Sequence, residues 1–421
     1  MVVVRSMSSS LRLYNLSSSY GLSQLTNVFN GKKSPKSNQK EAAVNHYKRS
    51  SHPTSVPLKK LFSGTFPLPL SESIQDYNAR NEPLKFQHDL LATLPFYPHQ
   101  DSLGRTSEVI QTPIDDKNFI NEFVIYPRNY DPSRYSQLNH LIMVHGYGAG
   151  LGFYLKNYNE VSRLDNWCIH AIDLLGYGCS SRPEFKLEKE ELSHVEAWFH
   201  DSFETWLKKR NLYDISSEKV MIMAHSMGAY LMGSYGINRN PDLCKKLLMV
   251  SPGAIIKHRK PVNVPTYFAK LWEQNISPFT LVRKAGPLGS KLVSGWSARR
   301  FAKLSKKEAN LLHKYAYGIF QQRGSGEYML NYLLAPGADA RHPLADRGIQ
   351  KLKCKLSWWY GKEDWMDIHG GKLCSKIINS HHDRQLSDVV EIEDSGHHIY
   401  LDNYQKFNCL LVEEMKNFEN I

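Results

Sequence analysis

The feature that most constrains this chain is an apolar run that ends in a turn with a serine at its apex. The run is residues 221–229, MIMAHSMGA, and a helical pattern follows it at once. Such a strand-to-helix turn exposes a serine hydroxyl, and the first backbone N–H groups of the helix can stabilise an oxyanion. Gly228 fills the second glycine position of the G-x-S-x-G pattern, whereas Ala224 replaces the first glycine. The segment therefore predicts a nucleophile at Ser226, the alternative being an inert serine at a helix cap.

A second apolar run ends at a His-Gly pair and predicts the other half of an oxyanion site. It covers residues 137–145 and continues as GYG. In an esterase, this loop supplies a backbone donor that complements the donor next to the serine. We expect the two donors to be the backbone N–H groups of Tyr147 and Met227. His145 itself is expected to be structural, because the site needs the geometry of the turn and not the imidazole.

A histidine-containing turn near the C-terminus predicts the general base. Residues 388–393 form a strand-like run, and the sequence DSGHH follows. Histidine is the usual base because its pKa lies near the working pH. His397, directly after Gly396, is the expected base, and His398 is the alternative.

The acid that orients the base is expected between the serine and the histidine in chain order. The strand-like residues 355–361 end in a turn that carries carboxylates. Asp364 is the expected acid, while Glu363 and Asp367 are alternatives. Asp173 precedes the serine, so we interpret it as a strand-end residue that binds loop backbone. A triad of this kind needs neither a metal nor an organic cofactor.

With these motifs in place, the chain resembles α/β-hydrolase fold proteins across residues 107–420. More narrowly, it is similar to fungal mitochondrial cardiolipin-specific deacylases and lysophosphatidic acid acyltransferases, which are relatives of the animal lipase-coactivator branch. The narrower resemblance rests on GPLGSK at residues 286–291, DWMD at residues 364–367 and HHIYLD at residues 397–402. It implies an α/β-hydrolase fold with a mostly parallel central sheet, helices on both faces and an inserted helical lid.

The spacing of His397 and Asp402 fits the H-x-x-x-x-D pattern of that family, which would make this pair an acyltransferase motif. Asp402 is also well placed to cap the helix predicted directly after it, with Gln405 completing a capping box. We favour the capping interpretation. Acyl transfer would still be open to the enzyme, because a lysolipid hydroxyl can attack an acyl-Ser226 intermediate in place of water.

The order of the apolar runs predicts one α/β domain with an insertion. The runs alternate with amphipathic stretches, which is typical of a parallel sheet covered by helices on both faces. We assign residues 107–254 and 347–421 to the hydrolase core, residues 255–346 to a lid, and residues 41–106 to a polar linker with short amphipathic segments.

The first forty residues predict mitochondrial import. They contain basic residues and many serines, and no acidic residue precedes Glu41. This composition is typical of a transit peptide, and a disordered basic tail is the alternative. No apolar run is long enough to span a bilayer, so we expect a soluble or peripheral protein. The expected location is the matrix side of the inner mitochondrial membrane, with the protein peripheral to it. The 6 cysteines are dispersed and form no metal-binding spacing, which favours a reduced compartment and no structural metal.

The predicted lid is expected to bind an anionic lipid surface. The formal net charge of the chain is +12, and residues 255–307 contain many cations with Glu273 as their only acid. Aromatic side chains stand among these cations, and this combination suits a phospholipid headgroup region. The expected surface residues are Lys257, Arg259, Lys260, Trp272, Arg283, Lys284, Trp296, Arg299 and Arg300. A solvated basic face is the alternative, and nucleic-acid binding is disfavoured because we recognise no docking module.

Together, the motifs predict a serine hydrolase of the phospholipase A type that deacylates an anionic glycerophospholipid. The resemblance implies cardiolipin as the substrate and monolysocardiolipin as the product. The alternatives are an acyl-CoA-dependent lysophosphatidic acid acyltransferase and a non-catalytic lipid-surface adaptor or lipase coactivator. The retained Ser226 counts against the adaptor.

Overall fold

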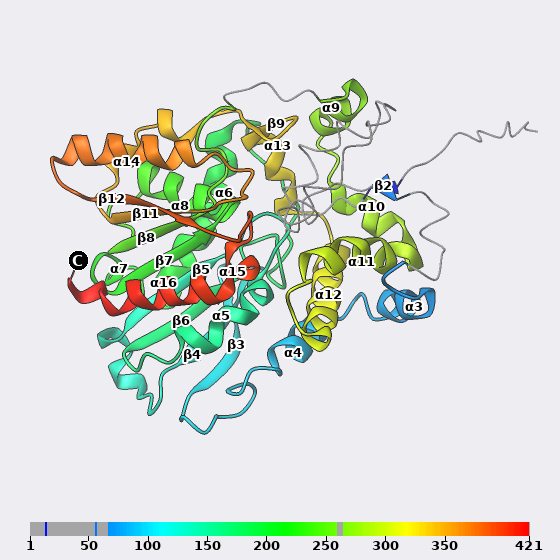
Figure 1. The fold of residues 1–421 in the computed structure, drawn as a ribbon, viewed down its shortest axis with the longest axis horizontal. Helices are drawn as coiled ribbons and strands as arrows, with labels where there is room; N and C mark the ends of the chain where they lie inside the picture. Colours follow the sequence, from blue (N-terminus) through cyan, green and yellow to red (C-terminus); the bar gives the residue numbers. More distant parts are fainter. Residues whose placement is uncertain (1–12, 15–54, 57–65, 259–263, 421) are drawn as a thin grey trace, which may run out of the picture.

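The centre of the computed structural model is a mostly parallel sheet (Figure 1). The structure describes residues 13–14, 55–56, 66–258 and 264–420. Within these ranges, the sheet has 8 strands in the order β12-β11-β8-β7-β5-β6-β4-β3. The parallel strands are β5 (Asn139–Val144), β6 (Trp167–Ile172), β7 (Val220–His225), β8 (Lys246–Val250), β11 (Lys355–Gly361) and β12 (Ser387–Ile392). The antiparallel strands at one edge are β3 (Thr106–Pro113) and β4 (Phe119–Tyr126).

The central strands are buried on both faces, which explains their nearly continuous apolar sequences. Neighbouring residues of one strand point to two different cores. Ile142 and Ile222 belong to one core, and Leu141 and Met221 belong to the other. Helices α6 (Leu192–Lys209), α8 (Met227–Asn238) and α14 (Ile368–His382) contribute to the first core. Helices α5 (Leu155–Val161) and α16 (Tyr404–Lys416) contribute to the second core, together with helices from outside the sheet region. The predicted fold class is therefore confirmed.

The described residues between β8 and β11 form a helical lid beside the sheet (Figure 1). Its longer helices are α9 (Thr266–Glu273), α10 (Pro278–Lys284), α11 (Gly289–Arg300) and α12 (Lys306–Gln321). Its shorter elements are η4 (Gly286–Leu288), η5 (Gly326–Met329), α13 (Leu330–Leu333), β9 (Leu334–Ala335), β10 (Asp339–Ala340), η6 (Leu344–Asp346) and η7 (Ile349–Lys351). Short elements elsewhere are η2 (Pro132–Gln137), η3 (Leu151–Tyr154), α7 (Ser216–Lys219), α15 (Ile399–Asp402) and η8 (Phe418–Asn420).

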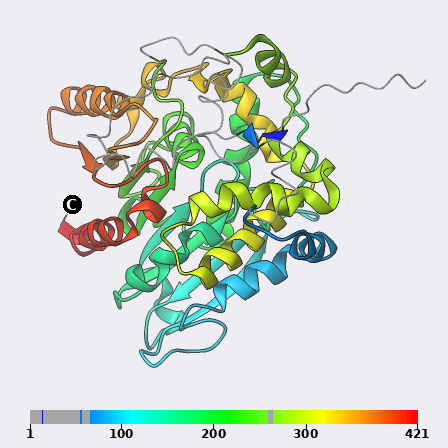
Figure 2. The same cartoon turned by 45° about the vertical axis from the view of Figure 1, so that its right-hand side comes forward.

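The region predicted as a polar linker contains two helices that pack against the lid. They are α3 (Leu70–Asn78) and α4 (Pro83–Leu91). Figure 2 shows both helices beside α11 and α12. Ser73 Oγ accepts a hydrogen bond from the backbone N–H of Lys291 at 2.9 Å. Phe86 packs so closely on Gly318 that a Cβ there would lie 2.5 Å from the ring. This segment is therefore a folded part of the lid assembly.

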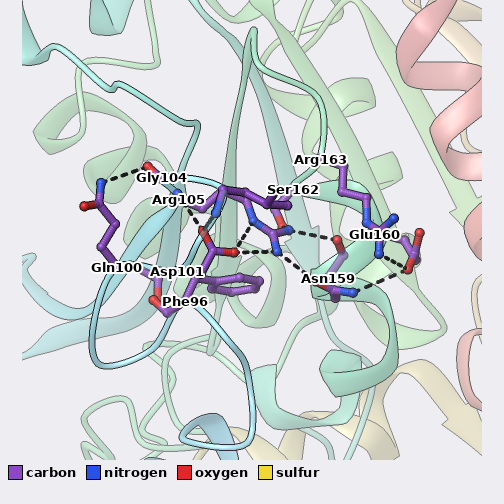
Figure 3. A network of polar contacts seen from close by, with 11 residues as sticks. Phe96, Gln100, Asp101, Gly104, Arg105, Asn159, Glu160, Ser162 and Arg163 are labelled. Carbon is purple, nitrogen blue, oxygen red and sulfur yellow. Dashed lines mark hydrogen bonds and ion pairs between the residues drawn. The ribbon is translucent and has the colours of Figure 1, made fainter.

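Arg105, just before β3, fixes the incoming chain to α5 (Figure 3). Its guanidinium donates to Asp101 Oδ2 at 2.9 Å, to Ser162 Oγ at 2.7 Å and to two oxygens of Asn159 at 3.0 and 2.9 Å. The ring of Phe96 packs 4.5 Å from the guanidinium carbon. Burial raises the pKa of Asp101, but the hydrogen bonds and charge of Arg105 more than offset this effect, so the pKa lies below its usual value. The buried cation is therefore fully paired.

None of the helices in the described ranges is long and apolar enough to cross a bilayer. The predicted transit peptide, residues 1–40, lies outside the described residues except for β1 (Leu13–Tyr14), which pairs with β2 (Ser55–Val56).

Candidate active site

Ser226 lies in a sharp turn between β7 and α8, at the carboxyl edge of the parallel strands. Its backbone has φ 53° and ψ −113°, a conformation that residues other than glycine rarely adopt and that functional turns retain. Gly228 must lack a side chain, because a Cβ there would lie 2.4 Å from the backbone oxygen of His145. Ala224 is buried at the end of β7, and the turn forms with alanine in this position.

The structure brings Ser226, His397 and Asp364 together in a hydrogen-bonded row. Ser226 Oγ lies 3.0 Å from His397 Nε2, and His397 Nδ1 lies 3.1 Å from Asp364 Oδ1. The side chains of His397 and Asp364 are 0% and 1% exposed. The backbone N–H of Met366 donates to Asp364 Oδ1 at 3.0 Å and holds the carboxylate in place. This row can pass the serine proton to the imidazole while the carboxylate stabilises the imidazolium.

The three residues meet because their strands end at the same edge of the sheet. Ser226 follows β7, Asp364 lies in the turn after β11, and His397 lies in the loop after β12. These strands run parallel, and β11 and β12 are adjacent in the sheet. Parallel strands present their carboxyl ends together, which is where sites form in open α/β sheets.

The alternative base, His398, and the alternative acids, Glu363 and Asp367, make contacts outside the hydrogen-bonded row. His398 packs against His225 with 5.1 Å between the ring centroids, and burial keeps the pKa of His398 well below its usual value. Asp367 caps the N-terminus of α14 with its side chain. Glu363 donates its backbone N–H to the backbone oxygen of Ser395 at 3.0 Å.

The backbone next to Ser226 provides the positions predicted for the oxyanion donors. Met227 is the first residue of α8, so its N–H lacks a helical partner four residues earlier. Tyr147 follows Gly146, and a Cβ on Gly146 would lie 2.9 Å from Ser226 Cβ. The loop after β5 therefore runs directly beside the serine, where its N–H groups could meet an oxyanion.

His145 and Asp173 hold the loops around the serine in place. His145 Nε2 accepts the backbone N–H of Leu174 at 3.0 Å, so Nδ1 carries the proton and donates it to the Gly146 oxygen at 2.7 Å. Burial lowers the pKa of His145 and favours this neutral form. The Asp173 carboxylate accepts backbone N–H groups from Leu151 and Cys179 at 2.7 and 2.8 Å. These contacts confirm the predicted structural roles of both residues.

The lid packs directly on the loop that follows β5. A Cβ on Gly148 would lie 2.5 Å from the Phe279 ring of α10. Arg182 donates to the backbone oxygens of Gly178 at 3.0 Å and Ile319 at 3.1 Å, which ties α12 to the core. A cavity of about 10 Å³, with room for about one water molecule, lies among Gly148, Phe279 and their neighbours. In this arrangement the lid is closed over the loop after β5, which carries the proposed oxyanion donor Tyr147.

Several residues predicted for the lipid surface lie inside the lid. Trp272 donates its Nε1–H to the Leu334 oxygen at 2.9 Å, and Trp296 is 7% exposed. Arg283 forms an ion pair with Glu327 at 2.6 Å. The prediction was wrong here because the spacing of apolar and basic residues does not reveal which helix face is buried. Of the others, Lys257 and Lys284 are exposed, Arg299 is half-buried, and Arg259 and Lys260 lie outside the described residues.

Arg300 and Asp402 form an ion pair at 3.0 Å, which corrects the predictions made for both residues. Asp402 ends α15, whereas Asn403 caps α16 with a side chain that accepts the Lys406 N–H at 3.3 Å. The predicted cap at Asp402 is wrong by one residue, because asparagine caps a helix as well as aspartate does. In this ion pair the Arg300 side chain is only 10% exposed.

A buried polar cluster that the sequence analysis missed lies among β4, β5 and β6. The ligand atoms of His140, Cys168 and His170 lie within 4.8 Å of one another. His140 Nδ1 is hydrogen-bonded to His170 Nε2 at 3.0 Å, and His140 Nε2 to the Tyr135 oxygen at 3.1 Å. His170 Nδ1 lies 2.6 Å from Glu122 Oε1. A metal would have to displace these bonds, so the cluster is a polar network of the sheet. Only strand pairing brings its members together.

The fold and the row of Ser226, His397 and Asp364 define the α/β-hydrolase class of protein. The sequence matches the family described as alpha/beta hydrolase fold over residues 139–404, and the chain belongs to this family. Solved structures agree with this fold. A bromoperoxidase from Bacillus anthracis and an esterase from Exiguobacterium antarcticum each give a TM-score of 0.51, with 13% and 17% identity, over 74% of this chain and 100% of theirs.

Curated relatives from plants and animals are more similar in sequence. A probable 1-acylglycerol-3-phosphate O-acyltransferase from Oryza sativa subsp. japonica is 29% identical over 72% of each chain. A 1-acylglycerol-3-phosphate O-acyltransferase from Arabidopsis thaliana is 30% identical over 66% of each chain. A (lyso)-N-acylphosphatidylethanolamine lipase from Homo sapiens is 31% identical over 65% of this chain and 78% of the relative.

Proposed function

We propose that this protein is a serine-dependent phospholipid deacylase that releases a fatty acid from an anionic glycerophospholipid. Cardiolipin, converted to monolysocardiolipin, is the proposed substrate. The observation that carries the proposal is the hydrogen-bonded row in which Ser226 Oγ lies 3.0 Å from His397 Nε2 and His397 Nδ1 lies 3.1 Å from Asp364 Oδ1. A row of this kind activates a serine for acyl transfer.

In the proposed reaction, Ser226 Oγ attacks the ester carbonyl carbon while His397 Nε2 accepts the hydroxyl proton. The oxygen of the tetrahedral intermediate receives hydrogen bonds from the backbone N–H groups of Tyr147 and Met227. His397 then gives the proton to the leaving glycerol oxygen, and an acyl-Ser226 ester remains. Water attacks this ester with His397 as the base, which frees the fatty acid. Asp364 keeps the imidazole in the productive tautomer throughout.

A lipid substrate is supported by the relatives and by the exposed part of the lid. The names of the human and plant relatives refer to phospholipids or to lysophospholipid acylation. Exposed cations on the lid, Lys257 and Lys284, could meet lipid phosphates. Three exposed apolar side chains lie on α9, on α10 and on the connection between them, and these are Leu271, Ile276 and Leu281. Exposed apolar surface of this kind often marks a site that contacts a membrane or another molecule.

The second candidate function is an acyl-CoA-dependent lysophosphatidic acid acyltransferase. The specific observation in its favour is the name of the rice and Arabidopsis relatives. Chemically, the two functions share the acyl-Ser226 ester and differ only in whether water or a lysolipid hydroxyl opens it. A non-catalytic adaptor would not need three polar side chains in a buried row. Burying polar groups costs free energy that their hydrogen bonds have to offset, so such a row is expected where chemistry requires it.

We also propose a mitochondrial location, peripheral to the matrix side of the inner membrane. The support is the basic, serine-rich composition of residues 1–40. Cardiolipin as substrate would fit this location. Fluorescence microscopy of the full chain and of a chain lacking residues 1–40 tests the location, and equal mitochondrial targeting of both would contradict the role of that segment.

The experiment that tests the function is lipidomics of the purified protein with mixed phospholipid vesicles. Reactions with and without acyl-CoA and lysophosphatidic acid separate the two candidates. Deacylation predicts monolysocardiolipin and free fatty acid without acyl-CoA, and Ser226→Ala should produce neither. Formation of phosphatidic acid that depends on acyl-CoA, with no fatty acid released in its absence, would favour the acyltransferase instead.

A further inference from the structure

We infer that Arg300 and Asp402 are positioning residues that tether lid helix α11 to the loop carrying His397, so that a docked lid keeps the base in place. The inference rests on the proposed function, because it concerns the activation of Ser226. It gives the H-x-x-x-x-D spacing a role without a second catalytic site.

The Asp402 carboxylate joins the lid to the backbone immediately before His397. Its Oδ2 accepts the backbone N–H of Gly396 at 3.0 Å. Arg300 Nη2 donates to both carboxylate oxygens, at 3.0 and 3.1 Å. The side chains of Arg300 and Asp402 are 10% and 19% exposed, so water screens the pair weakly. Hydrogen bonds to an ionised group of this kind are stronger than neutral ones.

A second lid cation reinforces the same loop. Lys303, just after α11, donates its Nζ to the backbone oxygens of Asp394, at 3.3 Å, and Asp402. Asp402 also donates its own backbone N–H to the His398 oxygen at 2.8 Å. The lid therefore contacts this loop on both sides of His397 in the sequence.

These contacts flank the one side chain that must stay aligned with Ser226. On the far side, His225 Nε2 is hydrogen-bonded to the His397 backbone oxygen at 2.9 Å. Asp402 thus holds the backbone N–H of Gly396, and His225 holds the backbone oxygen of His397. Loss of the first anchor would let the imidazole shift, and a displacement of about 1 Å can lower a rate by on the order of 100-fold.

The same contacts argue against Asp402 as a separate base for acyl transfer. Both of its oxygens already accept hydrogen bonds, and Arg300 neutralises its charge. The lid and the Gly396 backbone therefore already occupy both oxygens of this carboxylate. Its place in the fold is that of a residue acting through Gly396 and His397.

The test uses the full-length protein with Arg300→Met, Arg300→Lys and Asp402→Asn. The measured quantities are kcat and KM for a soluble short-chain nitrophenyl ester and the rate of Ser226 labelling by a fluorophosphonate. We expect Arg300→Met and Asp402→Asn to lower kcat and the labelling rate by on the order of 10- to 100-fold. We expect KM to change by no more than about 2-fold, because neither residue binds substrate. Arg300→Lys should recover part of the loss, since it keeps the charge.

The matched control is Lys156→Met, which breaks another ion pair between lid and core. Lys156 of α5 pairs with Glu308 of α12 at 2.7 Å, with both side chains 23% exposed, and Glu308 Oε2 also accepts hydrogen bonds from Ser305 within the lid. This pair joins α12 to α5, whereas Arg300 and Asp402 join α11 to the loop that carries His397. We expect this variant to keep the wild-type kcat. The double variant Arg300→Met with Asp402→Asn should lose no more activity than the worse single variant, because both changes break one tether.

Wild-type kcat and labelling rates in folded Arg300→Met and Asp402→Asn would overturn the inference. A loss of lysolipid acylation alone in Asp402→Asn, with ester hydrolysis intact, would also overturn it and assign Asp402 to acyl transfer. A wild-type protein that neither reacts with the fluorophosphonate nor cleaves the ester would instead contradict the proposed function. Where Arg300→Met does not fold, the comparison of Arg300→Lys with Lys156→Met decides the outcome.

Discussion

Phe279 of lid helix α10 stacks on Tyr147 of the proposed oxyanion loop, with ring centroids 5.6 Å apart and ring planes at 26°. Phe320 of α12 stacks on Phe279 in turn, at 4.7 Å between centroids. Phe279 is 3% exposed, so this contact is an internal part of the closed lid. The position of the lid is thereby coupled to the loop that would hold the oxyanion.

The first prediction concerns Phe279→Ala. Removing a buried phenyl ring should lower the free energy of unfolding by about 3–5 kcal/mol. Because the ring covers Gly148, the variant should also raise kcat/KM for a long-chain ester relative to an acetyl ester. The matched control is Phe301→Ala, which removes another buried lid ring whose aromatic contacts are Phe153 and Trp296. An equal change of the ester ratio in both variants would contradict a specific role of Phe279.

The second prediction tests the network of Figure 3. Arg105→Met leaves the Asp101 carboxylate buried without its partner, so the free energy of unfolding should fall by about 3–5 kcal/mol. Arg163→Met breaks the neighbouring pair with Glu160, whose side chains are 56% and 44% exposed. That variant should lose no more than about 1 kcal/mol. Urea unfolding followed by circular dichroism measures both, and equal losses would show that burial does not decide the effect.

The third prediction concerns the pH dependence of stability. Burial lowers the pKa of His200 to about 4, so the folded protein keeps this side chain neutral where the unfolded chain is protonated. The unfolded state then binds more protons, and stability falls as the pH drops from about 6.5 towards the folded pKa. One such histidine contributes about 1.4 kcal/mol per pH unit in that window.

His200→Gln should therefore make the loss of stability between pH 6 and pH 4.5 less steep than in the wild type. Glutamine can still donate to the backbone oxygen of Leu231, which His200 Nε2 contacts at 3.1 Å. Urea unfolding at several pH values measures the slope. Parallel slopes for variant and wild type would mean that His200 does not titrate between the folded and unfolded states in this range.

The fourth prediction concerns the exposed lid cations. Each lysine near an anionic membrane contributes about 1 kcal/mol, so Lys257→Glu with Lys284→Glu should weaken binding to anionic vesicles by at least roughly 30-fold at low salt. The control is Lys208→Glu with Lys209→Glu, at the end of α6 that leads back to the amino edge of the sheet. Vesicle co-sedimentation with and without cardiolipin measures binding. Equal binding to anionic and neutral vesicles would contradict a charge-dependent lid.

Much of the fold and the candidate triad could be predicted from the sequence. β5 and β7 are buried on both faces and thus read as continuous apolar runs. Ser226, Asp364 and His397 each follow a strand, and their chain order is typical of this fold. Each of these motifs is contained in a short segment of the chain, so it can be identified without contacts between distant residues.

The contacts around the lid could not be predicted, because they join segments far apart in sequence. Arg300 and Asp402 are 102 residues apart, and no local pattern pairs them. The polar sequence before residue 106 did not indicate that α3 and α4 are packed against other helices, because their partners, α11 and α12, come much later in the chain. The burial of Trp272 and Trp296 could not be predicted either, because the pattern of apolar and basic residues around them fits a buried helix face and an exposed helix face equally well.

The central claim is that Ser226 is the nucleophile of a lipid deacylase. The most direct measurement is the initial rate of fatty-acid release from cardiolipin-containing vesicles by the wild type and by Ser226→Ala, with the melting temperature as the control for folding. Because the hydroxyl supplies the chemistry and little packing, we expect an unchanged fold and a rate at least about 10³-fold lower. A folded Ser226→Ala protein that releases fatty acid at the wild-type rate would contradict the account.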